Sequence, residues 1–237
     1  MKYLTIVLSL LASTASYASD SLMVRQTEPE LSDIYVALES LGVTMYRFDL
    51  KDFLSARYNV SVHIDEFVNG EKTSGSPEFS LGTNIQSLKE FDETERDFIR
   101  EKYDIPEDSY EWDRITDITI HTRGQNDSSA FIIADIAGAG RCSFPVKRYP
   151  TGPDSTYFYH SRPFSFNGIP HDSTTVSIPL VLYGSGWYDQ EHNLVRFCGE
   201  EKIDPEMQAE ILGYLPHYYI VYLKMSLCQD DGKESLR

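Results

Sequence analysis

The chain has 237 residues, a formal net charge of −16 at pH 7, 41% hydrophobic residues and 24% charged residues. These fractions are typical of a folded globular protein, and the length allows one large domain or two small ones. The negative charge argues against nucleic acid as a partner, because phosphate backbones would repel the surface. No helix rich in Lys and Arg is present to bind an anionic membrane surface.

The first eighteen residues have the layout of a secretory signal peptide. Lys2 supplies a positive start, residues 3–11 are apolar, and Ser16 and Ala18 put small residues at −3 and −1 of a cut after Ala18. The apolar run is shorter than the roughly 20 residues that span a bilayer. The alternative is a buried N-terminal helix or strand. We expect export to the periplasm or the extracellular space, with no membrane insertion of the mature chain 19–237.

The N-terminal half of the mature chain mixes helix and strand signals. Thr27 and Glu30 fit a capping box for a helix that stops at Gly42. Asn69-Gly70 is a tight-turn signal for a hairpin, and Asp92 fits the cap of a second helix. In chain order, the expected elements are a helix at 27–42, strands at 43–50, 58–67 and 72–81, and a helix at 91–103.

Strand signals dominate the C-terminal half. Asp204 and Pro205 predict a third helix, with Asp as the N-cap and Pro at the first helical position. The expected elements are strands at 115–121, 130–137, 142–146, 157–160, 176–183 and 193–198, a helix at 204–215, a strand at 217–227 and a polar tail at 229–237. The whole pattern predicts a single α+β domain, predominantly an antiparallel, sandwich-like β-sheet with about three short helices.

Several longer motifs resemble a known group of proteins. They are residues 178–185, Trp187-Tyr188-Asp189, Arg196-Phe197-Cys198-Gly199-Glu200 and Pro216-His217-Tyr218-Tyr219, with residues 62–70 similar in kind. Together they resemble small exported Bacteroidetes proteins that are grouped as a domain of unknown function. The resemblance implies export and a single domain, and it brings no activity and no catalytic residues.

Cys142, Cys198 and Cys228 would meet an oxidising compartment after export. Three thiols allow one disulfide and leave one thiol over. The favoured pair is Cys142 with Cys198, because both lie in strand-like segments while Cys228 lies near the polar tail. The alternative is three buried free cysteines, which behave as small hydrophobic residues. The spacing matches no structural zinc site.

The candidate binding site consists of Trp187, Tyr188, Asp189, Glu191 and His192. The acidic side chains suit calcium, and the histidine would admit a transition metal, but the spacing matches no known metal signature and no metal is expected. Aromatic faces stack on sugar rings, and neighbouring carboxylates accept hydrogen bonds from hydroxyl groups. A polar hairpin loop with a core tryptophan explains the same residues without any ligand.

Other motifs give weaker signals for catalysis. The pairs Asp65-Glu66 and Glu200-Glu201 could serve glycoside hydrolysis if their separation were suitable. Gly184-Ser185-Gly186 lacks the Gly-x-Ser-x-Gly pattern of a hydrolase nucleophile and predicts a tight turn instead. No glycine-rich phosphate loop is present, so no nucleotide cofactor is expected.

The sequence favours an exported, non-catalytic binding or interaction protein. The reasons are the predicted signal peptide, the acidity, the aromatic-rich β fold and the lack of a recognisable catalytic constellation. Its ligand would be a glycan or another envelope protein. The alternative is a secreted hydrolase with a carboxylate or metal site around Asp189, Glu191 and His192. A purely structural envelope component is a third possibility.

Overall fold

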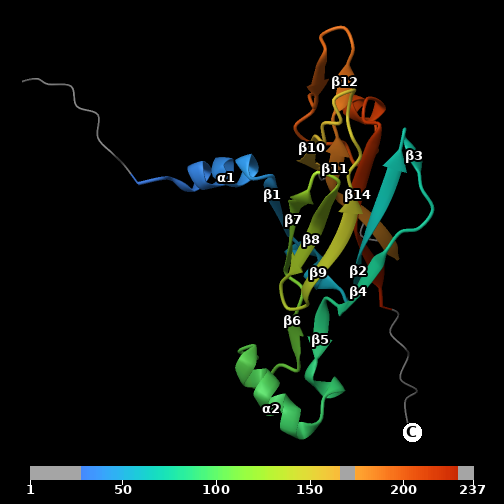
Figure 1. Ribbon diagram of the computed structural model, residues 1–237. Helices are drawn as coiled ribbons and strands as arrows, with labels where there is room; N and C mark the ends of the chain where they lie inside the picture. Colours follow the sequence, from blue (N-terminus) through green and yellow to red (C-terminus); the bar gives the residue numbers. More distant parts are fainter. Residues whose placement is uncertain (1–27, 166–173, 229–237) are drawn as a thin grey trace, which may run out of the picture.

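The computed structural model describes residues 28–165 and 174–228 (Figure 1). The predicted signal peptide 1–18 and the polar tail 229–237 lie outside the described residues. Two antiparallel sheets pack against each other, and the described residues contain the α-helices α1 (Leu31–Ser40) and α2 (Glu93–Lys102). The predicted α+β, mainly antiparallel fold is confirmed. No helix within the described ranges has the length and apolarity that a membrane crossing requires.

Each sheet has a simple strand order. The four-stranded sheet has the order β1 (Val43–Asp49), β7 (Asp117–Asn126), β8 (Ser129–Ile136) and β9 (Gly140–Lys147). The six-stranded sheet has the order β10 (Tyr159–Pro163), β11 (Thr175–Ser185), β14 (His217–Leu227), β2 (Tyr58–Val68) and β3 (Glu71–Lys72), with β4 (Glu78–Thr83) also paired to β2. Every pairing in both sheets is antiparallel.

The main core lies between the two sheets. Alternate residues of β2, such as Val60 and Val62, are completely buried, and they join a cluster that includes Ile120 and Ile132 of the opposite sheet. Phe144 of β9 is 2% exposed and meets the Phe79 ring of β4 edge-on, with ring centroids 5.0 Å apart. The period-two alternation in the sequence therefore has its expected cause, the burial of one face of each strand.

A second cluster covers the other face of the six-stranded sheet. Tyr218 and Ile220 of β14 point to this face and pack with Ile203, Ile211 and Leu215. These last three residues belong to the segment that follows the β12–β13 hairpin, which is built from β12 (Trp187–Asp189) and β13 (Leu194–Arg196). This segment, residues 197–216, covers this end of the sheet, and we call it the lid segment.

The prediction of a helix at 204–215 is wrong. The Asp204 carboxylate accepts the backbone N–H of Glu206 at 3.0 Å, and the Asp204 carbonyl accepts the N–H of Met207 at 2.9 Å. Met207 has a φ of 60°, which lies outside the helical region. A side chain that would cap a helix instead closes a turn here. Only the short 3-10 helix η4 (Glu210–Gly213) remains.

Other boundaries also differ from the prediction. The first helix has Glu30 as its N-cap, and the Asp33 carboxylate accepts the Glu30 backbone N–H at 2.8 Å. Thr27, the other residue of the predicted capping box, lies outside the described residues. The return strand predicted at 72–81 is broken into β3 and β4, with Gly75 at a φ of 99° between them. The predicted hairpin turn is confirmed, since Asn69 and Gly70 both have the positive φ that a two-residue hairpin loop needs.

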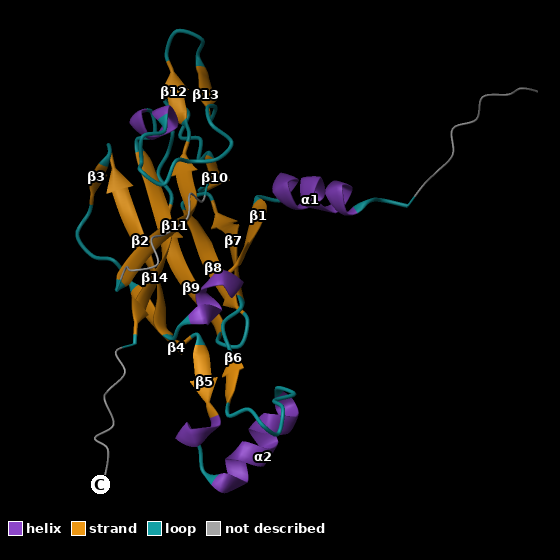
Figure 2. Ribbon diagram, turned by 180° about the vertical axis from the view of Figure 1, so that it is seen from behind, coloured by secondary structure: helices purple, strands orange, loops and turns teal. Residues whose placement is uncertain are grey.

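Two parts of the chain project from the sandwich (Figure 2). Helix α1 extends sideways from β1 and has no buried residue. At the end opposite the β12–β13 hairpin lies the α2 lobe, which comprises β5 (Ile85–Ser87), the 3-10 helix η3 (Leu88–Glu90), α2 and β6 (Glu111–Asp113). Leu88, Ile105 and Trp112 form the small core of this lobe. The predicted capping of α2 by Asp92 is confirmed, and Glu95 completes a capping box with it.

All three cysteines are free in the structure. Cys142 is buried in the main core on β9, whereas Cys198 is exposed beyond β13. The favoured Cys142–Cys198 bridge is therefore not formed. Both residues do lie in or beside strands, but those strands belong to different sheets, and sequence patterns do not report that separation.

Candidate functional site

The β12–β13 hairpin continues directly from β11. Gly186 joins the two strands, and its N–H donates to the Phe158 carbonyl at 2.8 Å. A Cβ at Gly186 would lie only 2.7 Å from both the Arg196 carbonyl and the Val195 side chain, so the close approach of β13 requires glycine. The predicted turn at Gly184-Ser185-Gly186 is thus an extended segment, and Ser185 is buried at the end of β11.

An aromatic pair joins the hairpin to the lid segment. The Trp187 ring stacks on the Tyr214 ring, with centroids 5.2 Å apart and ring planes at 22°. Tyr214 follows η4, and its side chain remains 51% exposed. Its hydroxyl donates a hydrogen bond to Glu210 Oε1 at 2.9 Å, which fixes the ring direction.

The Glu200 carboxylate binds the start of η4 and so holds the lid segment in place at the site. The two Glu200 oxygens accept the backbone N–H groups of Glu210 at 2.9 Å and of Ile211 at 3.4 Å. Hydrogen bonds from the backbone N–H of Glu200 itself and then from those of Glu210 and Ile211 hold the pKa of Glu200 below its usual value. Glu200 is therefore ionised at neutral pH, and it positions the segment that carries Tyr214.

Asp189 organises the hairpin end of the site. Its Oδ2 lies 2.6 Å from Arg196 Nε and 2.9 Å from His192 Nδ1. Its Oδ1 accepts the backbone N–H groups of Glu191 and His192. Burial alone would raise the pKa of Asp189, but the hydrogen bonds from His192 and the charge of Arg196 outweigh it and lower that pKa.

These side chains line a groove between the hairpin and the lid segment. Its volume is about 720 Å³, and Trp187, Asp189, His192, Arg196, Glu210 and Tyr214 are among the residues that line it. This volume is within the range of small-molecule binding sites, which is about 300 to 1,000 Å³. The groove offers an apolar aromatic wall, several hydrogen-bond acceptors and a guanidinium group.

The structure brings part of the predicted site together. Trp187, Asp189 and His192 line the groove, whereas Tyr188 and Glu191 do not. Tyr188 alternates to the other face of β12, and its hydroxyl bonds to the Asn193 side chain. Glu191 is exposed in the hairpin loop. Within the described residues, no group of three or more His, Cys, Asp or Glu side chains could hold a metal ion.

Seven of the ten lining residues lie outside the predicted binding site, and four of these seven have charged or aromatic side chains. These four are Arg196, Glu200, Glu210 and Tyr214. The hairpin pairing places Arg196 directly opposite Trp187, so a register assignment for the hairpin could have found it. Glu210 and Tyr214 reach the groove only because the lid segment folds back onto the sheet, and no local sequence signal reports that.

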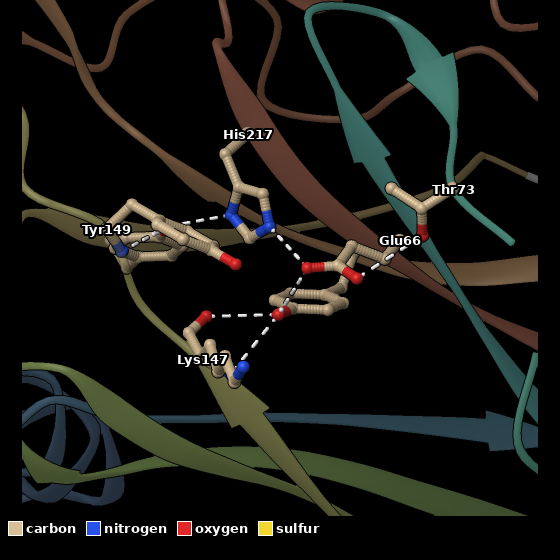
Figure 3. A network of polar contacts seen from close by, with 7 residues as sticks. Glu66, Thr73, Lys147, Tyr149 and His217 are labelled. Carbon is tan, nitrogen blue, oxygen red and sulfur yellow. Dashed lines mark hydrogen bonds and ion pairs between the residues drawn. The ribbon is translucent and has the colours of Figure 1, made fainter. Parts of the chain in front are cut away.

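A second polar constellation lies between the two sheets, and we call it the polar clasp (Figure 3). His217 Nε2 lies 2.9 Å from Glu66 Oε1, and His217 Nδ1 lies 2.7 Å from the Tyr159 hydroxyl. The Tyr219 hydroxyl donates to the same Glu66 oxygen at 3.0 Å, and it also accepts the backbone N–H of Lys147 at 3.1 Å. The clasp therefore ties β2, β10 and β14 to the end of β9.

Burial sets the charge state of the polar clasp. It lowers the pKa of His217, although the neighbouring Glu66 carboxylate raises it in part. Burial also opposes ionisation of Glu66, but hydrogen bonds from His217 and Tyr219 outweigh it and lower the pKa of Glu66. The pKa values of Tyr159 and Tyr219 are raised by burial, so both hydroxyls stay protonated. The groups satisfy one another, so the clasp serves to hold the sheets together.

The two carboxylate pairs do not form glycosidase-like sites. Asp65 and Glu66 are neighbours on β2 and therefore point to opposite faces of the sheet. Asp65 is bound by Lys72 at 2.7 Å and by the Ser76 hydroxyl at 2.6 Å, away from the polar clasp. Glu200 holds η4, while Glu201 is exposed.

The fold and the groove together define a β-rich, two-sheet protein with a surface groove of ligand size. A family model described as "Domain of unknown function (DUF5041)" matches residues 13–226, which include the α2 lobe, the groove and both sheets except the last residue of β14. The chain belongs to this family. No curated protein and no solved structure matches the chain.

Proposed function

We propose that this protein is an exported, non-catalytic binding protein whose groove holds a glycan. The observation that carries the proposal is the Trp187–Tyr214 pair, which forms an aromatic wall in a groove of about 720 Å³. A sugar ring has an apolar face that packs against an aromatic ring. Its hydroxyl groups donate hydrogen bonds, and the carboxylates of Glu200 and Glu210 are the acceptors nearby.

The size of the groove favours a saccharide over an envelope protein. Stable protein interfaces bury about 800 Å² on each partner and are generally broader than a groove of this kind. The layout of residues 1–18 supports export to the periplasm or the extracellular space, where glycans are abundant. The resemblance to exported Bacteroidetes proteins agrees with this location.

No observation favours the hydrolase alternative. Both oxygens of Asp189 are already engaged by Arg196, His192 and the hairpin backbone. Glu191, the second acid of that hypothesis, lies outside the groove lining. The groove residues are thus arranged to hold one another and to present an aromatic surface.

Replacing Tyr214 with alanine should weaken saccharide binding at least about tenfold, because buried aromatic anchors dominate binding energy. The measurement is isothermal titration calorimetry of the exported protein against a broad panel of oligosaccharides. Tyr110→Ala is the matched control, since Tyr110 is 48% exposed and directly precedes β6 of the α2 lobe. This lobe lies at the end of the molecule opposite the β12–β13 hairpin (Figure 1). The proposal fails if no saccharide binds, or if Tyr214→Ala binds as tightly as Tyr110→Ala.

A further inference from the structure

One carboxylate of the groove is paired with a guanidinium group, and two carboxylates are not. Arg196 Nε lies 2.6 Å from Asp189 Oδ2, so the single guanidinium of the lining is paired with one carboxylate. Glu200 accepts two backbone N–H groups, and Glu210 accepts the Tyr214 hydroxyl. Among the described residues, neither Glu200 nor Glu210 has an ion-pair partner. Two negative charges therefore remain beside the aromatic wall.

The hydrogen-bonding groups of the groove also favour a ligand that donates hydrogen bonds and carries positive charge. A carboxylate has about four lone-pair sites, and Glu210 uses one oxygen for the Tyr214 hydroxyl, while its Oε2 has no partner among the residues that the structure describes. Unused acceptors therefore face the groove beside the exposed Tyr214 ring. A ligand that matches this surface brings donors and positive charge together with an apolar ring face.

The aromatic pair adds to the same preference. An ammonium group near the face of Trp or Tyr is attracted by the negative face of the ring. A carboxylate or sulfate in the same place would meet the ring face and two uncompensated carboxylates. The whole chain, with a net charge of −16, repels such anions further.

We infer that the groove selects saccharides that carry free amino groups, and that it discriminates against acidic sugars. This inference rests on the proposed glycan-binding function and assigns its ligand class. The sugar ring packs on the Trp187–Tyr214 wall, and the ammonium group lies toward Glu200 and Glu210. The hydroxyl groups use the remaining acceptor positions of these carboxylates.

The test compares three oligosaccharides of equal length by calorimetry on the exported protein. They are β-1,4-linked glucosamine with free amines, the same oligomer fully N-acetylated, and an oligomer of galacturonic acid. We expect the amine-bearing oligomer to bind about fivefold tighter than the acetylated one at low salt, and the uronic acid oligomer to bind weakest. High salt should shrink the difference, because exposed charges are screened.

Two variants that each replace a glutamate with neutral glutamine test which carboxylate causes the preference for amine-bearing sugars. Glu210→Gln keeps an acceptor for Tyr214 and should reduce the preference to about twofold. Glu191→Gln removes an exposed charge from the β12–β13 hairpin loop, outside the groove lining, and should leave the preference unchanged. Equal effects of the two variants, or uronic acid binding as tight as the amine-bearing oligomer, would overturn the inference and leave glycan binding intact. If no oligosaccharide binds, the proposed function itself fails.

Discussion

Replacing Phe144 with alanine is expected to lower the free energy of unfolding by about 4 kcal/mol, because a buried Phe→Ala change leaves a cavity. Phe144 is among the largest fully buried side chains, and it lies where β9 packs over β4 of the opposite sheet. The loss is a large share of the roughly 5 to 15 kcal/mol that stabilises a typical domain. Urea unfolding monitored by circular dichroism measures it.

Phe98→Ala is the matched control for the core variant. The Phe98 side chain is 66% exposed on α2, so its removal uncovers no core and should change the unfolding free energy by less than about 0.5 kcal/mol. If the two variants unfold at the same urea concentration, β9 does not close the core as the structure shows.

Replacing Glu66 with alanine is expected to cost about 2 to 3 kcal/mol of folding stability, since it removes a charged acceptor from two buried donors. His217 is 5% exposed at its side chain and would lose its Glu66 partner, while Tyr219 could still turn to the Lys147 carbonyl at 3.1 Å. Thermal and urea unfolding of the variant measure the loss.

Glu66→Gln distinguishes the hydrogen bonds of the polar clasp from simple loss of volume. Glutamine keeps one oxygen that can accept from both His217 and Tyr219, so it should retain most of the stability. The double variant of Glu66→Ala with His217→Ala should be less destabilised than the sum of the two single variants, because the two residues share one interaction. Strict additivity would contradict the clasp.

The sequence predicted the parts of the fold that depend on neighbouring residues. The strand β2 shows the expected alternation of Val60, Val62 and Ile64 because one face of a pleated strand is buried. Asn69 and Gly70 adopt the left-handed backbone, which glycine reaches because it lacks a Cβ and asparagine because its short polar side chain can hydrogen-bond locally. These features are decided within a few residues, so they are visible without the rest of the chain.

The candidate site was predicted in part for the same reason. Trp187, Asp189 and His192 are close in sequence and stay together in the hairpin. Their partner Tyr214 is brought there by the lid segment, whose Ile211 and Leu215 pack on the far face of the six-stranded sheet. That contact is long-range, and the Asp204-Pro205 signal even indicated a helix where the chain forms a turn.

We propose that a saccharide binds against Trp187, and the two tryptophans of the chain allow a direct test. Trp187 lines the groove, whereas Trp112 lies in the core of the α2 lobe and serves as an internal reference. The measurement is the ¹H–¹⁵N spectrum of the two indole groups during titration with an oligosaccharide, assigned with Trp187→Phe. We expect the Trp187 signal to shift to saturation while the Trp112 signal stays fixed. A saccharide that binds by calorimetry but leaves the Trp187 signal unmoved, or shifts only Trp112, would contradict the account.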